Sequence, residues 1–126
     1  MTSPPDDNTP ETGWAGPYFY VRFDAFDVRF RPHPNEKLAD VSNVDAVVRL
    51  PDGSRWSATI VTSAEVERLM DHWTDTGEAT GGRYFWSSDA LIVQDPGVVP
   101  MAKVIAGLVD TGELRQIFKQ LDPPDQ

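Results

Sequence analysis

Residues 44–60 read VDAVVRLPDGSRWSATI, and they contain two alternating apolar runs separated by Pro51-Asp52-Gly53. The apolar positions are Val44, Ala46, Val48 and Leu50 before the separator, and Trp56, Ala58 and Ile60 after it. A three-residue loop that pairs Leu50 with Ser54 places both sets on one face, whereas pairing Leu50 with Arg55 turns them to opposite faces. The segment therefore predicts a β-hairpin whose loop is a type I turn followed by Gly53 in the left-handed conformation.

A second alternating region lies upstream, over residues 18–31. Its apolar positions are Phe19, Val21 and Phe23, then Phe26, Val28 and Phe30. The phase changes at Asp24-Ala25, which indicates either a reversal or a bulge. A two-residue hairpin would place Phe23 opposite Phe26, but Asp-Ala lacks the glycine that such turns favour. We therefore favour one long bulged strand and keep the hairpin as the alternative.

The segments downstream of the hairpin alternate between helical and extended patterns. Thr62 and Glu65 form a capping-box pattern for a helix that ends at Gly77, with apolar residues at helical spacing. Two short strands, 83–87 and 90–94, are predicted with a turn at Ser88-Asp89. A further helix begins near Asp95-Pro96 and ends at Gly112, and a last helix covers 114–121.

These elements predict an α+β fold. We expect a mainly antiparallel sheet of about five strands with helices on one face, in the order β-β-β-α-β-β-α-α. Asp-Thr-Gly-Glu occurs at 75–78 and again at 110–113, so a degenerate ββα duplication with a shift of 35 residues is one interpretation. The other is that two unrelated helix ends use the same stop residues.

Composition supports one domain with a tail at each end. The chain has 126 residues, of which 40% are hydrophobic, enough for one compact core. Residues 1–16 are acidic and rich in proline and are predicted to be disordered, as are residues 122–126, leaving 17–121 as a single domain. With no cysteine, no signal peptide and no apolar run long enough to span a membrane, the expected location is the cytoplasm.

The charge balance bears on the kind of partner. The formal net charge is -9, and without the five acids of the two tails there remain 15 acidic residues against 11 basic ones. A folded domain with this excess of acidic residues is repelled by phosphate groups. This argues against nucleic-acid and anionic-membrane binding, unless one face of the domain is basic despite the negative net charge.

No motif identifies a reaction or a cofactor. The glycine clusters match neither a phosphate-binding loop nor a dinucleotide fingerprint, and no serine lies in a nucleophile elbow. His33 and His72 are the only histidines and lack metal-ligand spacing, so we expect no metal and no cofactor. The sequence favours a non-enzymatic protein without settling the question.

The first functional hypothesis is a protein-binding module of the immunity, antitoxin or regulator type. It would act through the sheet face that the helices leave open, with another protein as partner or as a homodimer. Alternation turns tyrosines and arginines to that face, and these residue types are enriched among interface anchors. The candidate binding residues are Tyr18, Tyr20, Arg22, Val47 and Arg49.

The second hypothesis is a small-molecule-binding domain or an undetected small enzyme. Its site would be an aromatic pocket between sheet and helices, lined by Tyr84, Trp86 and Trp73 with His72 as the polar group. A deep aromatic pocket would favour this hypothesis, and a flat surface of tyrosine and arginine would favour the first.

Overall fold

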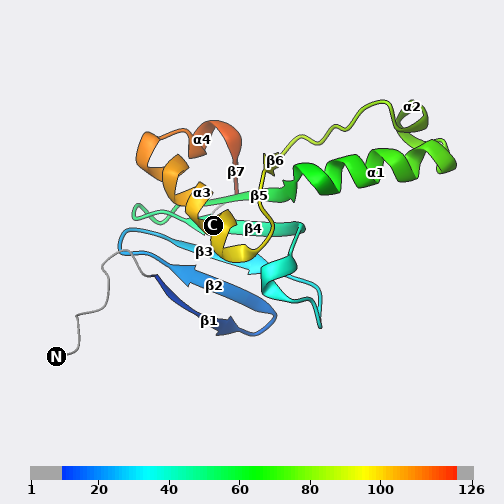
Figure 1. Cartoon of the computed structure of the whole chain (residues 1–126). Helices are drawn as coiled ribbons and strands as arrows, with labels where there is room; N and C mark the ends of the chain where they lie inside the picture. The colour runs from blue at the N-terminus through cyan, green and yellow to red at the C-terminus, as the bar shows by residue number, and fades with distance from the viewer. Residues whose placement is uncertain (1–9, 122–126) are drawn as a thin grey trace.

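A seven-stranded sheet organises the computed structural model, which describes residues 10–121 (Figure 1). The strands are β1 (Glu11–Ala15), β2 (Tyr18–Arg22), β3 (Asp27–Arg31), β4 (Asn43–Arg49), β5 (Arg55–Thr62), β6 (Ala90–Val93) and β7 (Lys119–Gln120). They are ordered β1-β2-β3-β4-β5-β6, with β7 also paired to β5, and only β5 and β6 run parallel. The predicted α+β class and mainly antiparallel sheet are confirmed, with two more strands than expected.

Four α-helices and one 3₁₀ helix accompany the strands within residues 10–121. They are η1 (Leu38–Asp40), α1 (Ser63–Thr76), α2 (Glu78–Gly82), α3 (Val98–Thr111) and α4 (Leu114–Ile117). The order of strands and helices is therefore β-β-β-β-β-α-α-β-α-α-β. It differs from the predicted order by the added strands β1 and β7, by the division of the predicted strand 18–31 into β2 and β3, by the added helix α2, and by the loss of the predicted strand 83–87.

The hairpin of β4 and β5 has the predicted loop. Leu50 N–H donates to the Ser54 carbonyl at 3.0 Å, and Gly53 N–H donates to the Leu50 carbonyl at 2.9 Å. Gly53 has φ +85°, the left-handed conformation that the turn requires. The Asp52 carboxyl accepts a hydrogen bond from the Ser54 hydroxyl, forms an ion pair with Arg115 at 2.9 Å and accepts a further hydrogen bond from Ser54 N–H. These bonds lower the pKa of the carboxyl group far below its usual value.

Residues 18–31 form the hairpin that we had kept as the alternative, so the preferred bulged strand is wrong. Arg22 pairs with Asp27, and Phe23 N–H donates to the Phe26 carbonyl at 2.8 Å. The rings of Phe23 and Phe26 stack with centroids 4.6 Å apart. This stacking closes a turn that contains no glycine, and the reversal keeps both apolar sets on the core face.

Residues 11–15 extend the sheet, although we had assigned them to a disordered tail. β1 pairs with β2, and its Trp14 ring meets the edge of Phe19 with centroids 5.3 Å apart. Gly13 lies opposite Tyr20, where a Cβ atom would come within 2.6 Å of the tyrosine hydroxyl. The glycine thus leaves room for the Tyr20 ring to lie over β1. The predicted tail residues 1–9 and 122–126 lie outside the described part of the chain.

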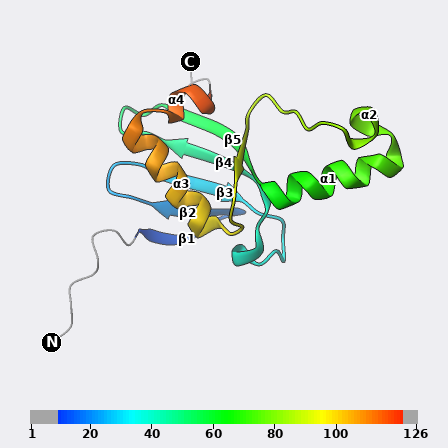
Figure 2. The same cartoon turned by 45° about the horizontal axis from the view of Figure 1, so that its top comes forward.

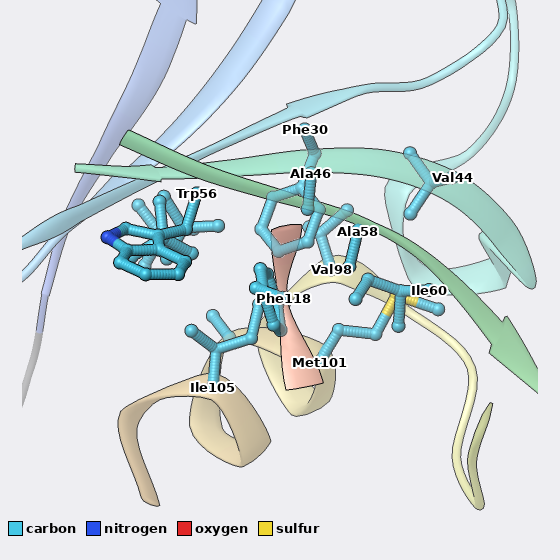
Figure 3. Packing of buried hydrophobic residues seen from close by; sticks show 14 of the residues in the cluster. Phe30, Val44, Ala46, Trp56, Ala58, Ile60, Val98, Met101, Ile105 and Phe118 are labelled. Carbon is cyan, nitrogen blue, oxygen red and sulfur yellow. The ribbon is translucent and has the colours of Figure 1, made fainter. Parts of the chain in front are cut away.

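The hydrophobic core lies between one face of the sheet and α3 (Figures 2 and 3). From α3, four buried side chains face the sheet: Val98, Met101, Ala102 and Ile105. Figure 3 shows Val98, Met101 and Ile105 meeting residues of β4 and β5, with Phe118 beside Ile105. Each fully buried side chain of this size contributes about 1.5–3 kcal/mol, so this layer accounts for much of the stability of the fold.

α1 is capped as predicted but runs away from the sheet (Figures 1 and 2). Thr62 Oγ1 accepts a hydrogen bond from Glu65 N–H at 3.1 Å, and Gly77 ends the helix with φ +85°. Val66 is its only buried residue.

The predicted hairpin over 83–94 is absent. Residues 83–89 form no strand, and β6 pairs parallel with β5 on its edge opposite β4. A parallel neighbour requires a long crossover, which α1, α2 and residues 83–89 supply. The structure therefore has no second ββα unit. It does show that α1 and α3 each have 14 residues and end on the same tetrapeptide with glycine in the left-handed conformation.

The predicted last helix, 114–121, stops at Ile117. Phe118 adopts an extended conformation (ψ 154°) and its side chain is buried, with 4% exposed. The next two residues then pair with β5 as β7. A continued helix would leave this edge of β5 without hydrogen-bond partners among the described residues, so backbone pairing favours the strand.

Candidate functional site

The sheet face opposite α3 carries no helix within residues 10–121, and we call it the open face. Directly opposed residues of neighbouring strands share a face, so the strand register defines its members. They are Glu11, Gly13, Ala15, Tyr18, Tyr20, Arg22, Asp27, Arg29, Arg31, Asn43, Asp45, Val47, Arg49, Arg55, Ser57, Thr59, Val61, Ala90, Ile92 and Lys119. Their neighbours along each strand, such as Val21, Val28 and Val48, are buried on the core face.

Basic side chains gather on the open face. It holds six of the eleven basic residues of the chain but only three of its twenty acidic residues. The basic face that the overall charge could have hidden therefore exists, and the rest of residues 10–121 holds 13 acidic residues against five basic ones. An acidic partner would be attracted to the open face and repelled elsewhere.

The arginines of β2 and β3 lie against the tyrosines. Arg22 donates to Glu11 at 3.2 Å, and its guanidinium lies 5.0 Å from the centre of the Tyr20 ring. The Arg31 guanidinium lies 5.7 Å from the centre of the Tyr18 ring. These contacts orient both guanidinium groups along the sheet, where their donors remain accessible.

Three of the arginines have no carboxylate partner within residues 10–121. Arg29, Arg31 and Arg49 form no ion pair there, although Asp27 lies opposite Arg49 and Asp45 opposite Arg31. A guanidinium group carries five donors arranged for a planar acceptor such as a carboxylate. The open face therefore offers unused binding capacity for carboxylate groups.

Two shallow hollows indent the open face side by side. The larger, about 340 Å³, is lined by Arg31, Asp45 and Ser57, and the smaller, about 170 Å³, by Asp27, Arg49 and Arg55. Tyr18, Arg29 and Val47 line both. These three residues therefore form the ridge between the hollows, at which a protruding partner side chain would meet a ring and a guanidinium group together.

All five predicted partner-binding residues lie on this face: Tyr18, Tyr20, Arg22, Val47 and Arg49. Their binding role stays a prediction. The sequence prediction did not include Arg29 and Arg31. The hairpin alternative would have found both, because it places Arg29 opposite Tyr20 and Arg31 opposite Tyr18. The sequence prediction also missed Lys119, which reaches the face only because the last helix stops early.

The residues of the second hypothesis lie far from the open face, on α1 and the segment that follows it. Trp73 stacks on Phe85 with ring centroids 6.1 Å apart. Tyr84 and Trp86 are 53% and 77% exposed, and His72 is also exposed. Five cavities in residues 10–121 are lined by other residues. No observation therefore favours the aromatic pocket, which stays a prediction.

One hollow does lie between the sheet and a helix. It has a volume of about 330 Å³ and is lined by apolar residues and Gly97, among them Phe19, Leu38 and Val98. No ionisable side chain lines it, so it lacks the polar group that the second hypothesis requires.

Residues 10–121 contain neither a metal-binding cluster nor a membrane-spanning helix. No group of three or more histidine, aspartate or glutamate side chains is arranged to hold a metal ion. None of the helices there has the length and apolar character needed to cross a membrane.

Comparisons with protein-family models, with curated proteins and with solved structures find no significant match.

Proposed function

We propose that the chain is a non-enzymatic binding protein that recognises an acidic surface of another protein through the open face. The observation that carries the proposal is the set of arginines without carboxylate partners, Arg29, Arg31 and Arg49, beside the partly exposed rings of Tyr18 and Tyr20. Tyrosine and arginine bury large areas with little loss of rotamer freedom, which is why they dominate the energetics of many interfaces.

A protein partner fits this face better than a nucleic acid. The arginines are interspersed with the carboxylates of Glu11, Asp27 and Asp45, which would repel a phosphate backbone. A protein surface can present both signs of charge and match such a pattern. The strongly acidic remainder of the chain adds long-range repulsion of nucleic acids.

The test is a double substitution, Tyr20→Ser with Arg49→Glu, in a tagged protein used to capture partners from a lysate of the native host. Both side chains lie on the open face outside the core, so the unfolding midpoint in urea should stay close to that of the wild type. Capture of a stoichiometric partner should be lost, because the change removes a ring and reverses a charge.

A matched control is Tyr84→Ser with Arg83→Glu. It alters the same residue types by the same charge, at exposed positions outside the sheet. The control should capture the partner as the wild type does. Equal capture by all three proteins would refute recognition through the open face, and loss of capture by the control alone would move the binding surface to residues 83–89.

A further inference from the structure

The exposed side of α1 carries a row of carboxylates. Glu67, Asp71 and Asp75 are spaced four residues apart, so they lie on one side of the helix. All three are exposed, and none forms an ion pair within residues 10–121. The remaining acid of the helix, Glu65, is bound by Arg68 at 2.6 Å. We call Glu67, Asp71 and Asp75 the acidic row.

The acidic row points to an outside partner because of where α1 lies. α1 leaves the sheet at the end of β5 and extends beyond it (Figures 1 and 2). None of its side chains belongs to the hydrophobic core cluster. The chain thus presents a basic face on the sheet and an acidic row on a projecting helix.

The spacing of the two charged surfaces matches. Residues four apart on a helix are separated by about 6 Å along its axis, and residues two apart on a strand by about 6.7 Å. Glu67, Asp71 and Asp75 follow the first spacing, and Arg29 and Arg31 follow the second, with Arg49 on the neighbouring strand β4. A helix laid on the open face can therefore bring successive carboxylates to successive guanidinium groups.

We propose that the partner is a second copy of this chain, whose acidic row docks on the open face. This inference rests on the proposed function and names its partner. Each copy offers one projecting helix and one open face, so two copies can satisfy both contacts in a closed, two-fold pair. The rings of Tyr18 and Tyr20 add apolar contact beneath the helix.

The test measures the mass of the purified protein by sedimentation velocity over a range of concentrations and salt. The wild type should form a dimer at low salt that dissociates as salt is added, because exposed charges are screened. Glu67→Lys with Asp71→Lys and Asp75→Lys should weaken the dimer about tenfold or more, and Arg29→Glu with Arg31→Glu and Arg49→Glu should do the same. Mixing the two variants should restore a dimer that contains one chain of each.

The matched control reverses three exposed acids elsewhere, with Asp40→Lys, Asp95→Lys and Asp110→Lys. It changes the net charge by the same amount as the triple substitution of Glu67, Asp71 and Asp75 by lysine. It leaves the acidic row unchanged, so the dimer should form as in the wild type. Circular dichroism and the urea midpoint identify any variant that fails to fold. If a triple variant fails to fold, the single substitutions Asp71→Lys and Arg29→Glu replace the two triple variants in the dimer and mixing measurements.

A chain that is monomeric under all these conditions overturns the inference, as does a dimer that neither variant weakens or a mixture that fails to restore it. These outcomes are separate from those of the capture experiment. A monomeric chain whose Tyr20→Ser, Arg49→Glu variant loses a captured protein retains the proposed function with a different partner. If changes on the open face affect neither association nor capture, both proposals fail.

Discussion

α1 and α3 are helices of the same length that end on the same tetrapeptide, yet the fold treats them differently. Each has 14 residues and ends at a glycine in the left-handed conformation, Gly77 or Gly112. α3 buries four side chains against the sheet, and α1 buries one. Equal length and equal stop residues therefore do not determine whether a helix joins the core; the distribution of apolar side chains does.

The two helices are also stabilised by different interactions. α1 has a side-chain cap from Thr62 and a two-bond ion pair between Glu65 and Arg68. α3 begins at Gly97 with no side-chain cap and no acidic residue in its first turn. Local interactions thus support the helix that lacks burial, and burial supports the helix that lacks local interactions. This arrangement leaves the outer side of α1 available for contact with a partner.

The largest effect is expected for a change in α3. Ile105 is completely buried, so Ile105→Ala should lower the free energy of unfolding by about 2–5 kcal/mol through lost burial and a residual cavity. Val104→Ala, at a neighbouring position that is 41% exposed, should change it by less than about 0.5 kcal/mol. Urea unfolding followed by tryptophan fluorescence measures both. Similar values for the two variants would mean that α3 does not form the core layer described here.

A smaller effect is expected at the two matched glycines. A Cβ atom at Gly77 or Gly112 would meet no other atom within 4 Å, so Ala at either position is strained only by its positive φ. We expect each substitution to cost about 1–2 kcal/mol. Gly112→Ala should lower the global free energy of unfolding, because α3 unfolds with the core.

Gly77→Ala should instead act locally. It should raise the hydrogen-exchange rates of amides in α1 while leaving the urea midpoint nearly unchanged, because α1 contributes little to the core. If both substitutions shift the urea midpoint equally, α1 and α3 belong to one cooperative unit, and the contrast between the helices disappears.

The parts of the fold that sequence could predict are those specified by local interactions. The loop at Pro51-Asp52-Gly53 and the caps of α1 are examples, because the residues that make these bonds are neighbours in the chain. The placement of β6 depends on the free edge of β5, about thirty residues earlier, and no local pattern reports it. The end of α4 depends likewise on the core site that Phe118 fills.

The same distinction applies to the candidate site. Alternation alone placed Tyr18, Tyr20 and Arg49 on one face, because the period of a strand is a local property. The position of Arg29 followed from the turn at residues 24–25, where stacking of two phenylalanine rings outweighed a weak turn sequence. The concentration of arginines on one face therefore became visible only with the strand register.

The smallest effect we predict concerns the ion pair in the first part of α1. Two hydrogen bonds from Arg68, at 2.6 and 2.8 Å, hold the pKa of the Glu65 carboxyl below its ordinary value of 4.5. A lowered pKa means that the pair stabilises α1 fully above the ordinary value and that this contribution is lost as the pH falls through the lowered one. The effect is small because Arg68 lies largely in solvent.

A ¹³C NMR titration of the Glu65 carboxyl should show the lowered pKa in the wild type and a higher value in Arg68→Ala. Arg83→Ala, which removes an arginine outside this pair, should leave it unchanged. Equal Glu65 pKa values in the wild type and Arg68→Ala would show that the pair does not form in solution, and α1 would then lack one of the local interactions that distinguish it from α3.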